Sequence, residues 1–558
     1  MKNNNLTPIW LSIAVSIGLL LGFWLTNNAY KNQTSVILRS PHSTTSYSKL
    51  NEVLQLIDRA YVDTINKPKL IEDILPAILT DLDPHSVYIP KDEVQSMNED
   101  LEGSFSGIGV QFNIQNDTIM IVDVIAGGPS EKLGILPGDR IVMVNDTNFT
   151  GKEMTNNRVV KKLRGPKGST VKVGIKRNGS NQIWDYNITR DDIPVNSIDI
   201  AYPIQPGIGY IKVSQFGANT YNEFLTQLML LREKQGCQKF IIDLRGNSGG
   251  YLHAAIYMIN EFLQKEQLIV YTEGRSYPRE DVRADGNGYF KNNDICVLIN
   301  EWSASASEIF AGAIQDHDRG WIIGRRSFGK GLVQQQMDLQ DGSQMRLTIA
   351  RYYIPSGRCI QKPYKQGETE QYESELEKRY EHGEFFDQDS IVQNDSVVYY
   401  TSLGRKVYGG GGVMPDYFVG QDTTAHTAYY TQVFNSMTLY NFCFSYADKN
   451  RATLKQYKTW QELTAYLETT SYIEEFIQHA EKKGIKRNDK EIKQSEKLIK
   501  NQIQAYICRN ILGDKGFYPV LNLDDKTVQK AVEVLTSDEH SPESKDRKFI
   551  QSLFQWST

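Results

Sequence analysis

The sequence has few cysteines, no excess of basic residues and no repeats, and each of these absences excludes a class of protein or of binding site. Five cysteines in 558 residues are widely spaced and never form a C-x-x-C pair, so neither a zinc site nor a disulfide framework is indicated. The 62 lysines and arginines are outnumbered by 67 aspartates and glutamates, which disfavours nucleic acid as a partner. We find no internal repeats. A chain of this length exceeds a single core, so we expect a multidomain protein.

Long hydrophobic runs are also scarce, since there is only one. Residues 9–25, IWLSIAVSIGLLLGFWL, carry no charge over seventeen positions, which is short but sufficient for a membrane span. The next residues, TNNAYKN, offer no convincing cleavage site, so we expect an uncleaved single-pass anchor rather than a signal peptide. No second run follows, and the chain after about Tyr30 then lies on one side of the membrane.

Changes in residue pattern divide the rest of the chain. KLNEVLQLIDRAYVD carries apolar residues at helical spacing, whereas TIMIVDVI, DRIVMVND and TVKVGIKR alternate as short strands do. Further on, apolar strands such as KFIIDL and ICVLIN alternate with helical stretches, which is typical of an α/β core with a largely parallel sheet. We expect an anchor segment (1–30), a helical region (31–100), a β-rich domain (101–190), the α/β core (191–420) with a charged, solvated helical excursion (362–395), and a helical extension (421–558).

The stretch NEWSASASEIFAGA, residues 300–313, places three serines before a helical pattern. Ser305 and Glu308 fit the S-x-x-E capping box, which is a structural role. A nucleophile benefits from the same place, because a serine where the strand ICVLIN turns into a helix lies beside unpaired N–H groups that stabilise an oxyanion. Position alone leaves both interpretations open.

A serine nucleophile needs a base, and the core offers three candidates. His253 and His317 lie outside any G-x-S-x-G pattern, and an ordinary surface role explains either one. Lys330, in GRRSFGKGLVQ, follows an apolar strand and is flanked by glycines. Its loop begins like a phosphate-binding P-loop, but Gly331 stands where that loop needs Ser or Thr, and paired strands follow instead of a helix. Nucleotide binding is therefore disfavoured.

Lys330 can act as a base only when its amine is neutral, which requires its pKa to fall by roughly three units. A glycine-flanked loop between apolar strands is placed for the necessary burial, and a solvated loop lysine is the alternative. Another turn, in IIDLRGNSGGYLHAAI, sets Gly249 and Gly250 between a strand and a helix. These glycines either form a tight connection only, or supply N–H groups that complete an oxyanion hole with Ala306.

Together these segments resemble the carboxyl-terminal processing proteases, tail-specific serine peptidases with a Ser-Lys dyad. SASASEIFAGA, SFGKGLVQ, IIDLRGNSGG, LDPHSVYIP and GGGGVMPD occur in the family's order, and the β-rich segment falls where the family inserts a PDZ domain. The resemblance covers residues 47–419. It implies a multidomain α/β fold with a crotonase/ClpP-like protease core and an inserted PDZ domain, to which this chain adds a helical C-terminal extension.

The resemblance also implies roles for single residues. The family's nucleophile corresponds to Ser305, its lysine to Lys330, and the glutamine assigned to orienting that amine to Gln334. An acid that some schemes add as a charge relay corresponds to Asp316. The implied enzyme is a serine endopeptidase that forms an acyl-enzyme and needs neither metal nor cofactor. The alternative is a non-catalytic peptide-binding scaffold of the same fold.

In FSGIGVQF, the residues Gly107, Ile108, Gly109 and Val110 resemble the carboxylate-binding loop of the family's PDZ domain, and a glycine-rich hairpin is the alternative. Successive backbone N–H groups would hold the carboxylate of a protein substrate's tail, which adds as an extra strand with its last side chain in an apolar pocket. Bacterial members work outside the cytoplasmic membrane, which implies a single-pass inner-membrane protein with its catalytic domain in the periplasm. The excursion and the extension, for which the resemblance implies nothing, could hold a homo-oligomer together or restrict access to the site.

Overall fold

The structure, a computed structural model, describes residues 44–542 and 544, apart from 116, 126, 178, 179, 181 and 393–397. The predicted anchor, residues 9–25, lies outside the described residues. Within the described part, no helix combines the length and the apolarity needed to cross a membrane. The chain divides after Ile74 into two compact units, and each is described by itself.

The described part of the first unit, from Thr44 onward, is helical, as its apolar spacing predicts. It contains α2 (Thr44–Ala60) and the start of α3 (Lys67–Thr80), which continues into the second unit. Lys67 pairs with Asp58, with 2.6 Å between Nζ and Oδ2. Both side chains are exposed, so this pair contributes at most about 1 kcal/mol to stability.

The β-rich domain is a six-stranded antiparallel sheet in the order β3-β4-β5-β7-β8, with β6 paired to β5. The alternating runs predicted as strands form β4, β5 and β7, and apolar residues from one face of each strand pack in the core of the domain. β2 (Ser104–Gly107) and β9 (Asp191–Pro194), which begin and end the domain in the sequence, pair with each other. The remaining elements are β3 (Val110–Gln115), β4 (Thr118–Val124), α5 (Pro129–Lys132), β5 (Arg140–Val144), β6 (Thr147–Asn148), α6 (Asn156–Leu163), β7 (Thr170–Lys176) and β8 (Ile183–Thr189).

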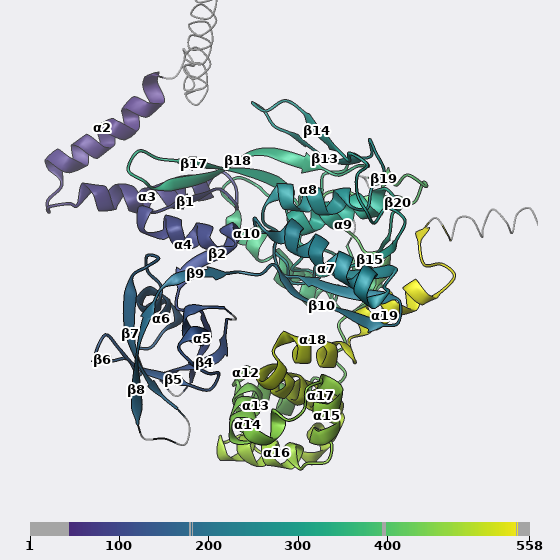
Figure 1. Ribbon diagram of the computed structural model, residues 1–558. Coiled ribbons are helices and arrows are strands. Elements are labelled where there is room, and N and C mark those ends of the chain that lie inside the picture. The colour runs from purple at the N-terminus through teal and green to yellow at the C-terminus, as the bar shows by residue number, and fades with distance from the viewer. Residues whose placement is uncertain are drawn as a thin grey trace, which may run out of the picture. The chain divides into compact units, whose positions relative to one another are not determined.

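The α/β core is built on a six-stranded sheet in the order β10-β11-β12-β15-β16-β21 (Figure 1). Only the β10-β11 pair is antiparallel, which confirms the prediction of a largely parallel sheet. Its elements are β10 (Ile198–Gln205), β11 (Ile208–Val213), α7 (Thr220–Gln235), β12 (Lys239–Asp243), α8 (Leu252–Asn260), β15 (Asp294–Ile299), α9 (Ala306–Asp316), β16 (Trp321–Gly324) and β21 (Tyr417–Phe418).

Side chains along these strands alternate between the two faces of the sheet. Ile242 and Val297 pack in the core that includes α7, α8 and α9, whereas Ile241 and Leu298 pack against α19 (Lys526–Thr536). On α19 the residues that face the sheet are almost completely buried, namely Val528, Ala531, Val534 and Leu535. The helical extension therefore covers one face of the six-stranded sheet.

A second sheet holds the segment that follows Lys330. β18 (Gln344–Tyr353) lies between β1 (Val87–Ile89) and β13 (Leu268–Glu273), and β17 (Leu332–Asp338) also pairs with β18. The paired strands predicted after Lys330 are confirmed, so the helix that a P-loop needs is not there. β14 (Glu280–Arg283) completes the sheet, and α4 (Lys91–Glu102) follows β1.

The excursion and the extension contribute the remaining elements. The excursion forms α10 (Thr369–Glu373), α11 (Glu375–Glu381) and the short 3₁₀ helix η1 (Gln388–Ser390), before β19 (Val398–Tyr400) and β20 (Lys406–Tyr408). The extension is helical, as predicted, and has an apolar core of its own. Its helices before α19 are α12 (Ala428–Asn435), α13 (Thr438–Lys449), α14 (Arg451–Leu454), α15 (Trp460–Leu467), α16 (Tyr472–Lys482), α17 (Asp489–Leu512) and α18 (Asp514–Asn522).

Candidate active site

Ser305 is the N-cap residue of α9, directly after the strand β15 and a short turn. Its backbone has φ of 55° and ψ of −114°, a conformation that non-glycine residues rarely adopt. Residues held in such conformations cluster at functional sites. The Ser305 N–H donates to Glu308 Oε2 over 2.9 Å, which is the half of the predicted capping box contributed by Glu308.

Glu308 also holds the loop that carries Lys330. Its fully buried carboxylate accepts hydrogen bonds from the Ser327 hydroxyl (2.5 Å), the Gly329 N–H (2.7 Å) and the Lys330 N–H (2.8 Å). The same oxygen, Oε2, accepts from both Ser305 and Lys330, so their backbones are close neighbours. Burial raises the pKa of Glu308 to about 7, although its four hydrogen bonds act in the opposite direction. This carboxylate fixes the serine and lysine loops together.

The Lys330 amine lies in a largely buried position beside Gln334. Lys330 Nζ donates to Gln334 Oε1 over 3.1 Å, and Gln334 Nε2 donates to the His85 carbonyl. Burial lowers the pKa of Lys330, Arg346 lowers it further, and the carboxylates of Glu308 and Asp83 raise it. Desolvation dominates, which is the condition that a lysine base requires.

The carbonyl that fixes Gln334 belongs to the turn in LDPHSVYIP. Asp83 shapes this turn by accepting the N–H groups of His85 (2.8 Å) and Ser86 (2.9 Å), and Thr348 on β18 donates to it as well. Burial lowers the pKa of His85 to about 4, so its ring is neutral at physiological pH. The turn therefore helps to position the lysine through main-chain geometry.

Tyr352, on β18, lies between the two candidate catalytic residues. Its buried hydroxyl donates to the Lys330 carbonyl. Burial raises the pKa of this hydroxyl well above its usual value, and the Ser305 side chain also acts on it by lowering that pKa. Among the contacts of the described residues there is no direct bond between Ser305 Oγ and Lys330 Nζ. Sequence reasoning missed Tyr352, because its segment was interpreted only as one of two paired strands.

Three residues were predicted as oxyanion donors, and the structure distinguishes among them. The Gly249 N–H donates to Asn247 Oδ1 over 2.8 Å. The N–H groups of Gly250 and Ala306 have no hydrogen-bond acceptor among the described residues. A Cβ added to Gly249 would lie 2.7 Å from Ser305 Cβ and 3.1 Å from Ala306 N, so this turn packs directly against the serine. The N–H groups of Gly250 and Ala306 are therefore available to a ligand, and Gly249 provides the close approach.

The structure does not bring Asp316 to this group. Asp316 ends α9, ten residues and about 15 Å from Ala306 along the helix. Its carboxylate pairs with Arg358 over 2.8 Å, both side chains being fully buried, and accepts the Ser356 N–H. His317 follows Asp316 and bonds to the Leu268 carbonyl. Both residues therefore have structural contacts at the far end of α9.

His253 lies on α8, and its ring stacks on Tyr251 with 5.1 Å between centroids. No shared hydrogen bond links it to Ser305 among the described residues. Lys330 is therefore the candidate base that the structure associates most closely with Ser305.

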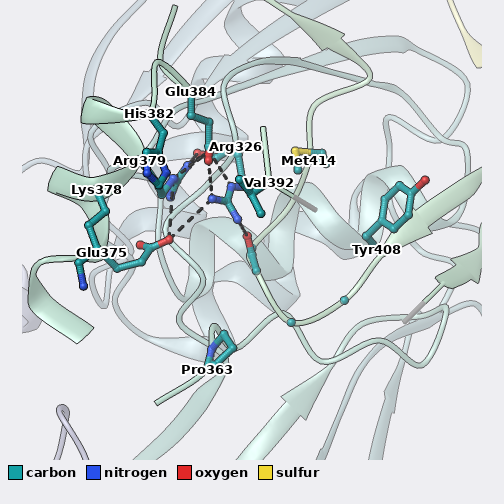
Figure 2. Close-up of a pocket in the computed structure, with 14 residues that line it drawn as sticks. Arg326, Pro363, Glu375, Lys378, Arg379, His382, Glu384, Val392, Tyr408 and Met414 are labelled. Carbon is teal, nitrogen blue, oxygen red and sulfur yellow. Dashed lines mark hydrogen bonds and ion pairs between the residues drawn. The ribbon is translucent and has the colours of Figure 1, made fainter. Parts of the chain in front are cut away.

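The charged excursion is less solvated than its composition predicts. Arg379 on α11 is buried and donates to the carbonyls of Ser327 (3.0 Å) and Arg326 (2.9 Å), just before Lys330. Figure 2 shows Arg326 and Arg379 directed at Glu384. The prediction of a solvated helical segment is wrong for this face, because a buried ion-pair cluster docks it onto the lysine loop.

A cavity of about 490 Å³ adjoins this cluster, and residues 409–412 of the GGGGVMPD turn line part of it (Figure 2). Neither Ser305 nor Lys330 lines this cavity, so it is separate from the candidate active site.

The predicted carboxylate-binding loop borders a cavity of about 250 Å³ in the β-rich domain. Gly107 ends β2, Val110 begins β3, and Gly109 between them has φ of 75°. β3 is an edge strand of its sheet, so its outer side can accept another strand. The lining is mainly apolar and comes from Phe105, Ile108, Val110, Phe112, Val160 and Leu163, together with Gly107, Gly109, Gln111 and Arg164.

Comparisons with known proteins agree with this architecture. A family model described as Peptidase family S41 matches residues 207–370, and a PDZ domain model matches residues 106–187. A carboxy-terminal-processing protease of Bartonella bacilliformis is 36% identical over 319 residues, which are 56% of this chain and 72% of that protein. The chain belongs to the carboxy-terminal processing protease family. It is a serine-type peptidase with a PDZ domain, as the sequence motifs predict.

Two further proteins are similar to this chain, one in sequence and one in its solved structure. The carboxy-terminal processing protease CtpB of Bacillus subtilis is 34% identical over 323 residues, 56% of this chain and 65% of that protein. Among solved structures, the photosystem II D1 C-terminal processing protease aligns over 68% of this chain and 95% of that chain, with 25% identity and a TM-score of 0.34. Residues 429–513, in the extension of this protease, match a family of unknown function.

Proposed function

We propose that the protease cleaves protein substrates through a Ser305–Lys330 dyad and selects them by their carboxyl-terminal tails. The observation that supports this most is the shared Glu308 carboxylate, which joins a serine in a strained backbone conformation to the loop of a desolvated lysine. A non-catalytic scaffold has no need for a buried amine with a lowered pKa.

In this mechanism the neutral Lys330 amine takes the proton of the Ser305 hydroxyl as Oγ bonds to the scissile carbonyl carbon. The carbonyl oxygen becomes an oxyanion, which the N–H groups of Gly250 and Ala306 stabilise. Collapse of this intermediate breaks the C–N bond, and Lys330 returns the proton to the leaving amine. Water then attacks the acyl-enzyme by the same route and releases Ser305.

The hydroxyl of Ser305 must change its partner before the attack. It interacts with the Tyr352 hydroxyl, while the Lys330 amine donates to Gln334. Catalytic hydrogen bonds are often formed only when substrate is bound. Substrate binding would therefore turn the Ser305 hydroxyl from Tyr352 toward the amine of Lys330.

The PDZ domain would supply the selection. A substrate tail can pair with the free edge of β3, with its carboxylate on the Gly107–Val110 loop and its last side chain among Ile108, Val160 and Leu163. This lining favours a terminal residue with an apolar side chain.

The proposed location is the cell envelope. The apolar run at residues 9–25 would anchor the chain by a single pass in the inner membrane, and the catalytic domain would lie in the periplasm. This proposal rests on the sequence and on the location of bacterial members of the family outside the cytoplasmic membrane.

The test is cleavage of an unfolded substrate with a free apolar tail. Wild-type protein should cut it, and Ser305→Ala and Lys330→Ala should lose nearly all activity, while His253→Ala and His317→Ala keep theirs. Mass spectrometry of envelope proteins from wild-type and Ser305→Ala cells would then identify substrates and cut sites. Tail binding without cleavage by the wild type would favour the scaffold instead.

A further inference from the structure

A buried polar network lies at the start of the glycine turn that contributes the oxyanion donors. Asp243, at the end of β12, is 1% exposed and accepts the Tyr210 hydroxyl over 2.7 Å. Arg245 pairs with the same carboxylate over 2.6 Å, and Lys212 donates to the Arg245 carbonyl. These contacts fix the main chain and side chain of Arg245 where the turn begins. A buried carboxylate is tolerated only with such partners.

The C-terminal extension supplies a further partner for Arg245. Arg245 Nη1 donates to Asp525 Oδ2 over 2.8 Å, and both side chains are largely shielded from solvent. The other oxygen of Asp525 accepts the N–H groups of Thr527 (2.9 Å) and Val528 (3.1 Å) and so begins α19. One carboxylate therefore starts a helix of the extension and holds an arginine of the catalytic turn.

The attachment of the extension at this point is extensive. Asn522 donates to the Tyr202 hydroxyl over 3.0 Å, and Lys239 donates to the Leu535 carbonyl over 2.6 Å. The ring of Tyr202 contacts that of Tyr210, with 5.4 Å between centroids, and Tyr210 in turn bonds to Asp243. Asp525 is thus held in place on both sides by neighbouring contacts.

Hydrogen bonds from the main chain of the glycine turn connect Arg245 to the segment around Ser305. The next residue, Gly246, donates to Asn300 Oδ1 over 2.9 Å. The Asn247 carbonyl then accepts the Ala304 N–H (3.0 Å) and the Ser307 hydroxyl (2.8 Å), on either side of Ser305. A shift of Arg245 would therefore move the turn relative to the nucleophile and its oxyanion donors.

We infer that Asp525 is a positioning residue for catalysis: by fixing Arg245, the C-terminal extension holds the oxyanion-binding turn in its productive geometry. This inference rests on the proposed function, since it assumes that Gly250 and Ala306 stabilise the oxyanion formed at Ser305. It assigns the end of the extension a part in the chemistry of the core.

The test compares Asp525→Asn with wild type in the full chain. Asparagine keeps an oxygen for capping α19 but replaces the carboxylate that faces Arg245. We expect kcat for a peptide substrate to fall about tenfold or more with KM changed less than about twofold, because interactions made only in the transition state affect kcat. A peptide aldehyde, which adds to the Ser305 hydroxyl and places its oxygen in the oxyanion site, should bind weaker by the same factor.

Controls separate this role from a structural one. Lys526→Ala removes the neighbouring exposed pair with Asp422 and should leave kcat unchanged. Asp525→Glu restores the charge and should recover part of kcat. Binding of a tail peptide to the PDZ domain should be equal in all variants.

The inference is overturned if Asp525→Asn keeps kcat and aldehyde affinity within about twofold of wild type. It is also overturned if the variant has a lower melting temperature but normal kcat well below that temperature, since Asp525 would then act on stability alone. If instead Ser305→Ala retains full activity, the proposed function itself fails, and this outcome is recognised independently of Asp525.

Discussion

At the scale of single residues, the proposed mechanism makes Lys330 the group that sets how cleavage depends on pH. Only its neutral amine accepts a proton, so kcat/KM should rise about tenfold per pH unit below its lowered pKa and level off above it. Lys330 also links stability to pH. Between its lowered pKa in the folded chain and its unfolded pKa near 10.4, the folded chain binds fewer protons at Lys330 than the unfolded chain does. The contribution of Lys330 to the free energy of unfolding therefore rises with pH over this range. Rates measured from pH 5 to 10 test this, and a flat acid side would contradict it.

Glu308 gives a second prediction at this scale. In Glu308→Gln an amide N–H₂ replaces one of the two accepting oxygens, so buried donors from the serine and lysine loops lose their acceptor. We expect kcat to fall at least about a hundredfold and the free energy of unfolding to fall by about 1–3 kcal/mol. Activity assays and urea denaturation measure both effects.

Glu462 provides the matched control for Glu308. It occupies the same place in the capping box of α15 with Thr459, but it is exposed. Glu462→Gln should therefore change stability by less than about 0.5 kcal/mol and leave activity unchanged. Equal effects of the two substitutions would show that Glu308 is only a helix cap.

The resemblance of several short motifs to a known family predicts Ser305, Lys330 and Gln334 as a candidate group, whereas local patterns alone leave the roles of Ser305 and Lys330 open. They do not reveal Glu308 as the link between the two loops, because its partners Gly329 and Lys330 lie about twenty positions further on. Tyr352 is a similar case, since its contact with Ser305 depends on how β18 packs beside the lysine loop. Contacts between distant segments are set by tertiary packing, which a local pattern does not encode.

At the scale of elements, the glycine turn before α8 must approach the serine closely. Gly249 has φ of 106°, and a Cβ there would lie 2.7 Å from Ser305 Cβ. Gly249→Ala should therefore displace the serine or the turn and lower kcat at least about a hundredfold. Steady-state kinetics on soluble, folded protein provides the measurement.

Gly246 is the control within the same turn. It also has a positive φ, 74°, but a Cβ there would meet no atom within 4 Å. Gly246→Ala should cost only about 1 kcal/mol of stability and retain most activity. If Gly246→Ala were as inactive as Gly249→Ala, backbone strain and not close contact would explain both.

The elements themselves were largely predictable. Apolar strands such as KFIIDL and ICVLIN form β12 and β15, and the helical stretches before and after β12 form α7 and α8. The excursion was less predictable, because its charges suggested solvent, whereas Arg379 and Glu384 are buried as partners of one another. The composition of a segment gives its charge but does not show whether its charged side chains form ion pairs in the folded chain.

At the scale of the whole molecule, the extension belongs to the structure of the protease core. Leu535 on α19 is fully buried against the sheet, so Leu535→Ala should destabilise the protein by about 2–5 kcal/mol. Leu523, between α18 and α19, is 51% exposed, and Leu523→Ala should cost less than about 0.5 kcal/mol. Thermal unfolding of both variants, monitored through the loss of peptidase activity, provides the measurement. Retention of full stability in Leu535→Ala would mean that α19 is dispensable.

The coverage of the catalytic sheet by α19 has a consequence for the timing of activity. During synthesis the ribosome releases Ser305 and Lys330 about two hundred residues before α19. Until that helix emerges, one face of the sheet remains bare, and the nascent chain carries both reactive side chains without the support that completes their scaffold. In the proposed mechanism, the order of the sequence would thus delay peptide hydrolysis until the chain is long enough to cover both faces of the sheet.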